Sequence, residues 1–140
     1  ADPVLSEAGV ARAEALSRAL ADFHPDHVFT SPLQRTRLTA APAAAFHSVP
    51  IEPVGFDGGT PAHVAAVAAR VRALPDDAVV FVVGHSNTIP LIARALGYTA
   101  AADMADCEYD RLTVLTLFEH EGEVDRTTAV VGRYGAPSAC

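Results

Sequence analysis

The stretch that decides the fold class is residues 78–88, with the sequence AVVFVVGHSNT. It begins with a continuous apolar run, Ala78 to Val83, of the kind found in strands that are buried on both faces of a parallel sheet. Gly84 permits a sharp turn, and the residues beyond it predict a helix from about Thr88 to Leu96 that ends at Gly97. A buried strand that leads directly into a helix is the repeating unit of α/β folds.

The same alternation of helix and strand continues on both sides of this stretch. Ser6 is placed to cap the first helix, and two later helices begin with a capping residue followed by proline, at Ser31-Pro32 and at Thr60-Pro61. Glu121-Gly122 separates two β-prone runs and predicts a hairpin. The elements expected besides those of residues 78–97 are helices at 6–22, 31–46 and 60–74, and strands at 27–30, 49–54, 112–118 and 124–131.

This order predicts one α/β domain over residues 1–140: a three-layer sandwich whose central sheet is mostly parallel and carries helices on both faces. The apolar face of the first helix is expected at residues 10, 13, 16, 20 and 23, which recur at helical spacing. Such domains usually open with a central strand, whereas this sequence opens with a helix.

Composition narrows the class of function. The formal net charge is −7 and the basic residues number only 10, all arginine, so the chain is a poor binder of nucleic acids or anionic membranes. No apolar run reaches the roughly 18 residues that a membrane span requires. The two cysteines, Cys107 and Cys140, have no metal-site spacing; whether they pair, and in which compartment the protein works, stays open.

The first candidate site is the stretch TSPLQRTRLTA at residues 30–40, which follows a predicted strand. Ligands of α/β proteins bind at the carboxyl ends of strands, and a helix that starts there offers free N–H groups to an anion. Ser31 and Arg35 are therefore candidates for binding a phosphate. The alternative is that Ser31 only caps the helix and that Arg35 and Arg37 form a solvated helix face.

The second candidate site is His85, at the junction of the buried strand and the next helix. A histidine at that position can donate a hydrogen bond to an anion or transfer a proton near neutral pH. A third polar group, Cys107 to Leu112, precedes a strand and contains Glu108 and Asp110. These side chains either line the site or orient His85, or they are simply the polar start of a strand.

These motifs together resemble the histidine phosphatase (phosphoglycerate-mutase-like) superfamily. TSPLQRTRLTA, then GHSNT at residues 84–88, LSEAG at residues 5–9 and EYDRL at residues 108–112 occur in the order found in that family and cover nearly the whole chain. The resemblance implies the phosphoglycerate-mutase-like three-layer fold, with a phosphate over the carboxyl ends of the strands. It implies a small phosphorylated substrate or inorganic phosphate as partner, without a metal or an organic cofactor.

The resemblance also assigns roles to residues. Arg35 matches the family's second phosphate-binding arginine, and His85 matches the histidine that stabilises the transferring phosphoryl group, with Asn87 as a further phosphate contact. Many members use an acid from the middle loop to protonate the leaving oxygen, and Asp57 is the candidate here. The implied activity is phosphomonoester hydrolysis through a phosphohistidine, with a phosphatase favoured over a mutase because the chain has no long additional loops.

One family feature is missing from the sequence. The nucleophilic histidine belongs to an Arg-His-Gly-type motif at the end of the first strand, and neither Arg-His-Gly nor Arg-His-Ala occurs here. The remaining histidines, at positions 24, 27, 47, 63 and 120, do not follow an arginine. We therefore expect the first strand to be missing from the chain, either because the sequence is incomplete at its N-terminus, which we favour, or because the strand has been lost.

Two other readings compete with this one. GHSNT resembles the nucleophile elbow of α/β-hydrolases, with Ser86 as nucleophile, one of Asp103, Asp106 and Asp110 as the acid, and His120 as the base. Against this, Thr88 stands where the elbow needs a second glycine. The other reading is a module that binds a phosphorylated ligand through Arg35 and His85 without turning it over. The oligomeric state is not predicted by any pattern.

Overall fold

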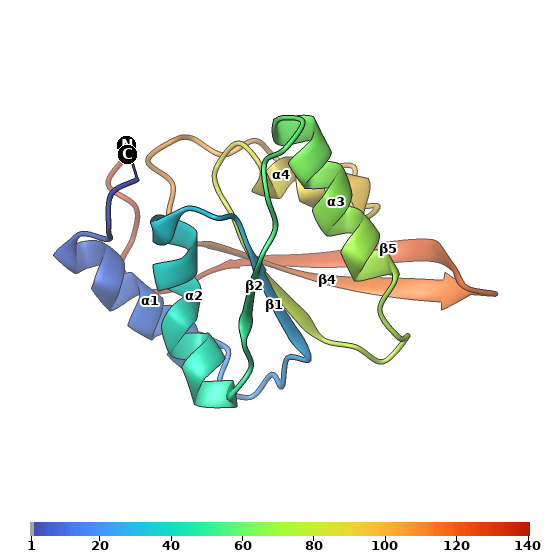
Figure 1. The fold of residues 1–140 in the computed structure, drawn as a ribbon, viewed down its shortest axis with the longest axis horizontal. Coiled ribbons are helices and arrows are strands. Elements are labelled where there is room, and N and C mark those ends of the chain that lie inside the picture. Colours follow the sequence, from blue (N-terminus) through green and yellow to red (C-terminus); the bar gives the residue numbers. More distant parts are fainter. Residues whose placement is uncertain (1) are drawn as a thin grey trace.

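The computed structural model describes residues 2–140. Its elements alternate as expected and then end in a hairpin (Figure 1). In chain order they are α1 (Glu7–Ala19), β1 (His27–Thr30), α2 (Gln34–His47), β2 (Ile51–Pro53), α3 (Thr60–Arg72), β3 (Val80–Val83), α4 (Ile89–Ala95), β4 (Arg111–His120) and β5 (Glu123–Arg133). None of these helices is both long enough and apolar enough to span a membrane.

The first three strands form a parallel sheet with helices on both faces, which confirms the α/β fold class. Their order is β2-β1-β3, and Val28 of β1 aligns with Ile51 and Phe81. Because side chains alternate along a strand, Val28 packs on α2 through Ala40 and Ala44, whereas its neighbour packs on the opposite face. That second face carries the larger apolar cluster, formed with α3 and α4 by Phe29, Val54, Val64, Val67, Ala68, Ile92 and Leu96.

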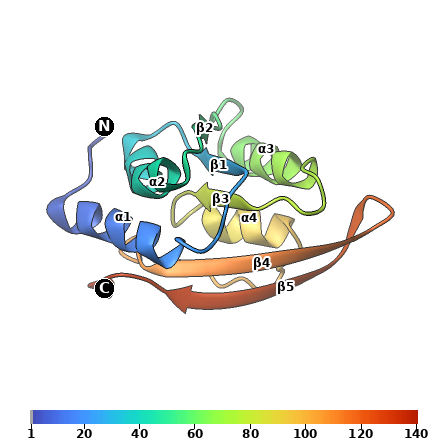
Figure 2. The same ribbon diagram turned by 90° about the horizontal axis from the view of Figure 1, so that it is seen from below.

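The last two strands form a separate antiparallel hairpin. β4 and β5 pair from Arg111 with Arg133 to His120 with Glu123, and the turn at Glu121-Gly122 has positive φ at both residues, as the expected hairpin requires. Figure 2 shows the hairpin beside the parallel sheet, with α1 and α2 toward one end of the view and α3 and α4 toward the other. Leu115 and Leu117 pack against the larger apolar cluster and join the hairpin to it.

Within residues 2–140 the parallel sheet and the hairpin are not hydrogen-bonded to each other. The structure corrects the expected burial of residues 78–83. β3 covers only Val80–Val83 and all four of its residues are partly exposed, because one edge of the strand has no neighbour within the described residues. A run of apolar residues indicates two covered faces, but it carries no information on whether both edges are paired.

The helix starts follow the expected signals only in part. Ser6 caps α1, its hydroxyl accepting a hydrogen bond from the Gly9 amide at 3.1 Å. Ala13, Leu16 and Leu20 are buried as expected, but Val10 and Phe23 are 48% and 44% exposed. Both other capping predictions are wrong: α2 begins at Gln34 rather than at Ser31, and α3 is preceded by Gly59 at φ 91°, with Thr60 already inside the helix.

The C-terminal tail is held to the start of β4. Cys107 and Cys140 form a disulfide, which settles the pairing that the sequence left open. The Ser138 hydroxyl donates to the Asp110 carboxylate at 2.7 Å and accepts from the Tyr109 amide at 2.8 Å. The tail therefore fixes the segment that leads into β4.

Candidate active site

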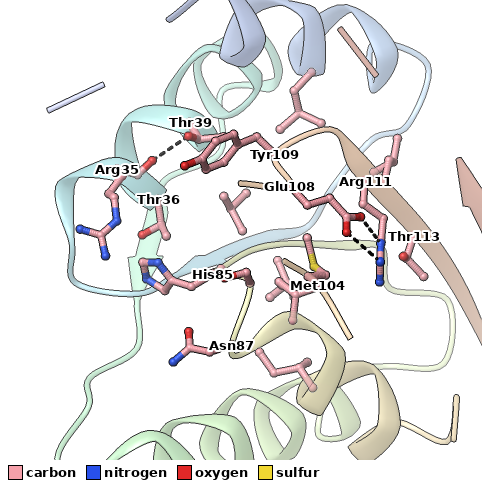
Figure 3. Close-up of a pocket in the computed structure, with 18 of the residues that line it drawn as sticks. Arg35, Thr36, Thr39, His85, Asn87, Met104, Glu108, Tyr109, Arg111 and Thr113 are labelled. Carbon is pink, nitrogen blue, oxygen red and sulfur yellow. Dashed lines mark hydrogen bonds and ion pairs between the residues drawn. The ribbon is translucent and has the colours of Figure 1, made fainter. Parts of the chain in front are cut away.

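A cavity of about 1010 Å³ opens between the carboxyl end of the parallel sheet and the hairpin. Figure 3 shows the polar side chains around it: Arg35 from α2, His85 and Asn87 after β3, and Glu108, Tyr109 and Arg111 at the start of β4. Segments far apart in the sequence meet here because parallel strands end at the same edge of their sheet. The two residues predicted to bind and stabilise a phosphoryl group, Arg35 and His85, thus line one cavity.

His85 is held by hydrogen bonds on two sides. Its Nε2 lies 2.8 Å from Oγ of Ser31, and its backbone amide donates to Oγ1 of the fully buried Thr88 at 2.9 Å. The Ser31 hydroxyl can accept from a protonated Nε2 or donate to an unprotonated one, so it holds the ring in either tautomer. Within residues 2–140 the other ring nitrogen, Nδ1, has no hydrogen-bond partner and can donate to a ligand.

The surroundings of His85 favour the neutral form of its imidazole. Burial lowers the pKa of His85 below its usual value, and electrostatic interactions with Arg35 and His63 lower it further. The side chains of Arg35 and His85 line the same cavity. An anion bound between them offsets both causes, because it favours the protonated imidazole.

Arg35 lies in the first turn of α2, and its side chain is exposed at the mouth of the cavity (Figure 3). Within residues 2–140 its guanidinium group makes no hydrogen bond or ion pair, so its donors are available to an anion. Arg37, on the same helix, differs in this respect: its Nε donates to the Pro32 carbonyl at 3.0 Å, and it does not line the cavity.

Ser31 lies behind His85 rather than in the cavity. It is 0% exposed, and its hydroxyl accepts from the Leu33 amide and also contacts Oγ1 of Thr36 at 2.9 Å. A direct phosphate contact by Ser31 stays a prediction; the observed contacts are those of a residue that positions His85. Asn87 is exposed and lines the cavity, as its predicted role requires.

Asp57, the predicted proton donor, is exposed and does not line the cavity. Its neighbour Phe56 does, with its ring centroid 6.2 Å from that of His85. His63 of α3 contacts this loop. Its Nδ1 lies 3.0 Å from the Val54 carbonyl oxygen, and its ring centroid lies 4.5 Å from that of Phe56. The sequence did not single out His63, because a histidine within a helix gives no sign of what its ring will reach.

The third polar group lines the cavity but does not contact His85. Arg111 and Arg133 both donate to the carboxylate of Glu108, at 2.6 and 2.8 Å, and Arg133 also reaches Asp110. Partial burial opposes the ionisation of Glu108, but the hydrogen bonds from the two arginines outweigh it and lower the pKa of Glu108. Glu108 and Arg111 therefore form a charged wall of the cavity rather than a partner for His85.

The catalytic triad expected of an α/β-hydrolase does not assemble. The Ser86 hydroxyl lies 3.4 Å from Oδ1 of Asp106, but His120 is at the opposite end of β4, with a 77% exposed side chain next to Glu121. The base that this reading requires is therefore out of reach of Ser86, which contradicts the α/β-hydrolase reading of GHSNT. Within the described residues, no three His, Cys, Asp or Glu side chains gather closely enough to hold a metal ion.

The comparisons with known proteins agree with this geometry. A family model described as the histidine phosphatase superfamily, branch 1, matches residues 1–54, which include the Arg35 segment. The resemblance to the histidine phosphatase superfamily is confirmed. A comparison with curated protein sequences gives no significant match.

Solved structures of histidine phosphatase relatives share the fold. The mycobacterial glucosyl-3-phosphoglycerate phosphatase Rv2419c superposes with a TM-score of 0.69 at 19% identity, covering 96% of this chain and 90% of that one. Its complex with inorganic phosphate gives a TM-score of 0.62 at 19% identity, with coverages of 99% and 88%. SixA from Nakamurella multipartitia, described as a "putative phosphohistidine phosphatase", gives a TM-score of 0.61 at 26% identity, with coverages of 99% and 87%.

Proposed function

We propose that this protein is part of a phosphomonoester hydrolase that works through a phosphohistidine intermediate. The observation that carries the proposal is the shared cavity of Arg35 and His85 at the carboxyl end of the parallel sheet. A guanidinium group and an imidazole that can become protonated suit the negative charge that spreads over the oxygens of a transferring phosphoryl group. The likeness to phosphatase structures, one of them in complex with inorganic phosphate, supports the same class of substrate.

The proposed reaction has two steps. An imidazole nitrogen attacks phosphorus, so that a nitrogen–phosphorus bond forms while the ester oxygen–phosphorus bond breaks and the leaving oxygen takes a proton. Water then attacks phosphorus and gives a proton to the carboxylate that protonated the leaving oxygen, the nitrogen–phosphorus bond breaks, and inorganic phosphate leaves. In both steps Arg35 and His85 donate to the phosphoryl oxygens, and Asn87 adds a contact. Asp57 is proposed as the proton donor, which requires its loop to close over the substrate.

The nucleophile is proposed to come from a segment other than residues 2–140. Of the histidines described, only His85 lines the cavity. The others are placed elsewhere: His24 packs edge-on against His47, His27 pairs with Glu52, His63 is buried under the Val54–Gly59 loop, and His120 is at the hairpin turn. The alternative is a domain that binds a phosphorylated ligand without turnover, and the same placement of histidines favours it for residues 2–140 taken alone.

Hydrolysis of an aryl phosphate, measured together with phosphate binding, tests the proposal. We expect the 140-residue chain to bind inorganic phosphate and to give no turnover, and we expect Arg35→Ala and His85→Ala to weaken binding. Arg37→Ala is the matched control, because Arg37 shares the helix but not the cavity. Equal binding by all four proteins would show that the phosphate site is elsewhere.

A further inference from the structure

His63 is a buried polar residue that the proposed reaction does not use. It lies in the first turn of α3, and at 1% exposure it is the largest side chain of the described residues that is buried to this degree. The other buried residues of this helix are apolar: Val64, Val67 and Ala68. Packing alone would therefore be served by an apolar side chain, and burial of a polar ring costs free energy unless its nitrogen atoms find partners.

The ring of His63 holds the start of the Val54–Gly59 loop, which leads from β2 to α3 (Figure 1). Its Nδ1 lies 3.0 Å from the Val54 carbonyl oxygen and 3.2 Å from that of Gly55. A carbonyl oxygen can only accept, so Nδ1 carries the proton and donates to both oxygens. The hydrogen bonds to the loop thereby fix the tautomer of the ring.

The backbone of His63 holds the other end of the loop. Its amide donates to the Gly59 carbonyl at 3.1 Å, and the Gly59 amide donates to the Phe56 carbonyl at 2.8 Å. Gly58 and Gly59 both have positive φ, and glycine restricts the backbone less than any other residue. The conformation of the loop therefore depends on its hydrogen bonds to His63 more than on the stiffness of its own chain.

Phe56 connects this loop to the site. Its ring lines the cavity, and the ring centroid lies 4.5 Å from that of His63 and 6.2 Å from that of His85. Both distances are within the range of aromatic pairs. Asp57, the proposed proton donor, is the next residue of the same loop. A displacement of the loop would therefore move a side chain that lies beside His85.

We propose that His63 is a positioning residue for His85. Its Nδ1 donor fixes the Val54–Gly59 loop, and this loop holds Phe56 beside His85. His63 itself does not line the cavity, so it acts on a bound phosphate only through the loop. The hydrogen bonds of the ring, rather than its bulk, carry the role. This inference rests on the proposed function, because it takes Arg35 and His85 as the groups that bind phosphate.

Two substitutions separate the donor from the ring. Asparagine carries an N–H donor at the same number of bonds from Cα as Nδ1, whereas phenylalanine keeps an aromatic ring without a donor. We expect His63→Phe to raise the Kd of the 140-residue chain for inorganic phosphate by about threefold or more, and His63→Asn by less than about twofold. The matched control is His47→Phe: the His47 Nε2 also donates to a backbone carbonyl, that of Leu20 at 3.1 Å, but His47 does not line the cavity.

Two NMR measurements report on the loop and on His85 directly. In His63→Phe the Gly59 amide should exchange with solvent about tenfold faster relative to the Val67 amide within α3, whereas a general loss of stability would change both. The pKa of His85 should rise toward its ordinary value of 6.5, because burial is the largest of the causes that lower it. His63→Asn loses only the weaker electrostatic influence of His63 and should raise this pKa less.

Phe56→Ala tests the second link, and it decides alone if His63→Phe does not fold. It keeps both anchors of the loop, so we expect a higher phosphate Kd and a higher His85 pKa with unchanged Gly59 exchange. The proposal is overturned if the His85 titration and the phosphate Kd stay at their wild-type values in His63→Phe, or in Phe56→Ala where that is the variant that folds. Equal phosphate Kd values for His63→Asn and His63→Phe would also overturn it.

Failure of the proposed function has a different signature. Phosphate binding that Arg35→Ala weakens and His63→Phe does not would leave the proposed function standing and remove the role of His63. A wild-type chain that does not bind phosphate would remove the phosphate site. The His85 titration and the Gly59 exchange would then still decide whether His63 positions His85.

Discussion

Replacing Arg35 gives the sharpest test of the phosphate site. The guanidinium group is exposed and has no partner within residues 2–140, so its removal breaks no hydrogen bond or ion pair of the described structure. A hydrogen bond to a charged group contributes about 1.5–3 kcal/mol, and solvent at the mouth of the cavity favours the lower end. A loss of about 1.5 kcal/mol corresponds to a roughly tenfold increase in the Kd for inorganic phosphate.

Titration calorimetry with inorganic phosphate measures this change. Arg35→Lys keeps the charge but not the bidentate guanidinium donor, so we expect its Kd for phosphate to lie between those of the wild type and Arg35→Ala. Raising the salt concentration should weaken the wild type more than Arg35→Ala, because the lost interaction is screened. Arg37→Ala, whose guanidinium is already bonded to the Pro32 carbonyl, should match the wild type.

The same substitution has a second, independent readout. The charge of Arg35 is one of the causes that lower the pKa of His85, so Arg35→Ala should raise that pKa in an NMR titration of the imidazole. The reasoning about the site would be refuted if Arg35→Ala left both the phosphate Kd and the His85 titration unchanged, or if Arg37→Ala altered them equally.

Three further predictions concern stability. The pKa of His85 is lower in the folded state than its ordinary value of 6.5, so the unfolded state binds more protons below that pH. The free energy of unfolding should therefore fall as the pH drops from about 6.5 through the folded pKa. Urea titrations should show a shallower decline for His85→Asn. Ser31→Ala removes a fully buried hydroxyl with three partners and should lower the free energy of unfolding, measured in urea, by about 1–3 kcal/mol. Ser86→Ala, which removes one contact at 3.4 Å, should lower it by less than about 0.5 kcal/mol. Similar losses in the two variants would contradict the positioning role of Ser31. Loop-closure entropy for the Cys107–Cys140 separation of 33 residues gives about 3.7 kcal/mol, so Cys140→Ser should unfold at clearly lower urea concentration, and an unchanged midpoint would argue against the pairing.

The sequence predicted the elements whose signals are local. β1 has its expected bounds, and the hairpin turns at Glu121-Gly122, because short β-prone runs and turn residues act through their nearest neighbours. The meeting of Arg35 and His85 was also predictable, since both follow strands of one parallel sheet. The start of α2 was not: Ser31 has the sequence of a cap, but the helix begins at Gln34, and the Ser31 hydroxyl also contacts His85, 54 residues along the chain.

The sequence could not predict the features that depend on which residues, distant in the chain, come into contact in the fold. The apolar run before Gly84 predicts covered faces, yet the exposure of β3 is set by an edge that has no partner among residues 2–140. The contact between His63 and the Val54 carbonyl depends on how a loop closes over a helix. The ion pairs of Glu108 depend on Arg133, which the register of the hairpin brings back beside the start of β4.

The disulfide between Cys107 and Cys140 has a mechanical consequence. It closes a covalent ring that contains the whole β4–β5 hairpin, from the segment before β4 to the last residue. A pulling force applied to the two ends of the chain would pass from Cys107 straight to Cys140 and would not stretch the hairpin. The fully extended chain would then be shorter by the contour of the ring, about 110 Å, and reduction of the bond would release that length.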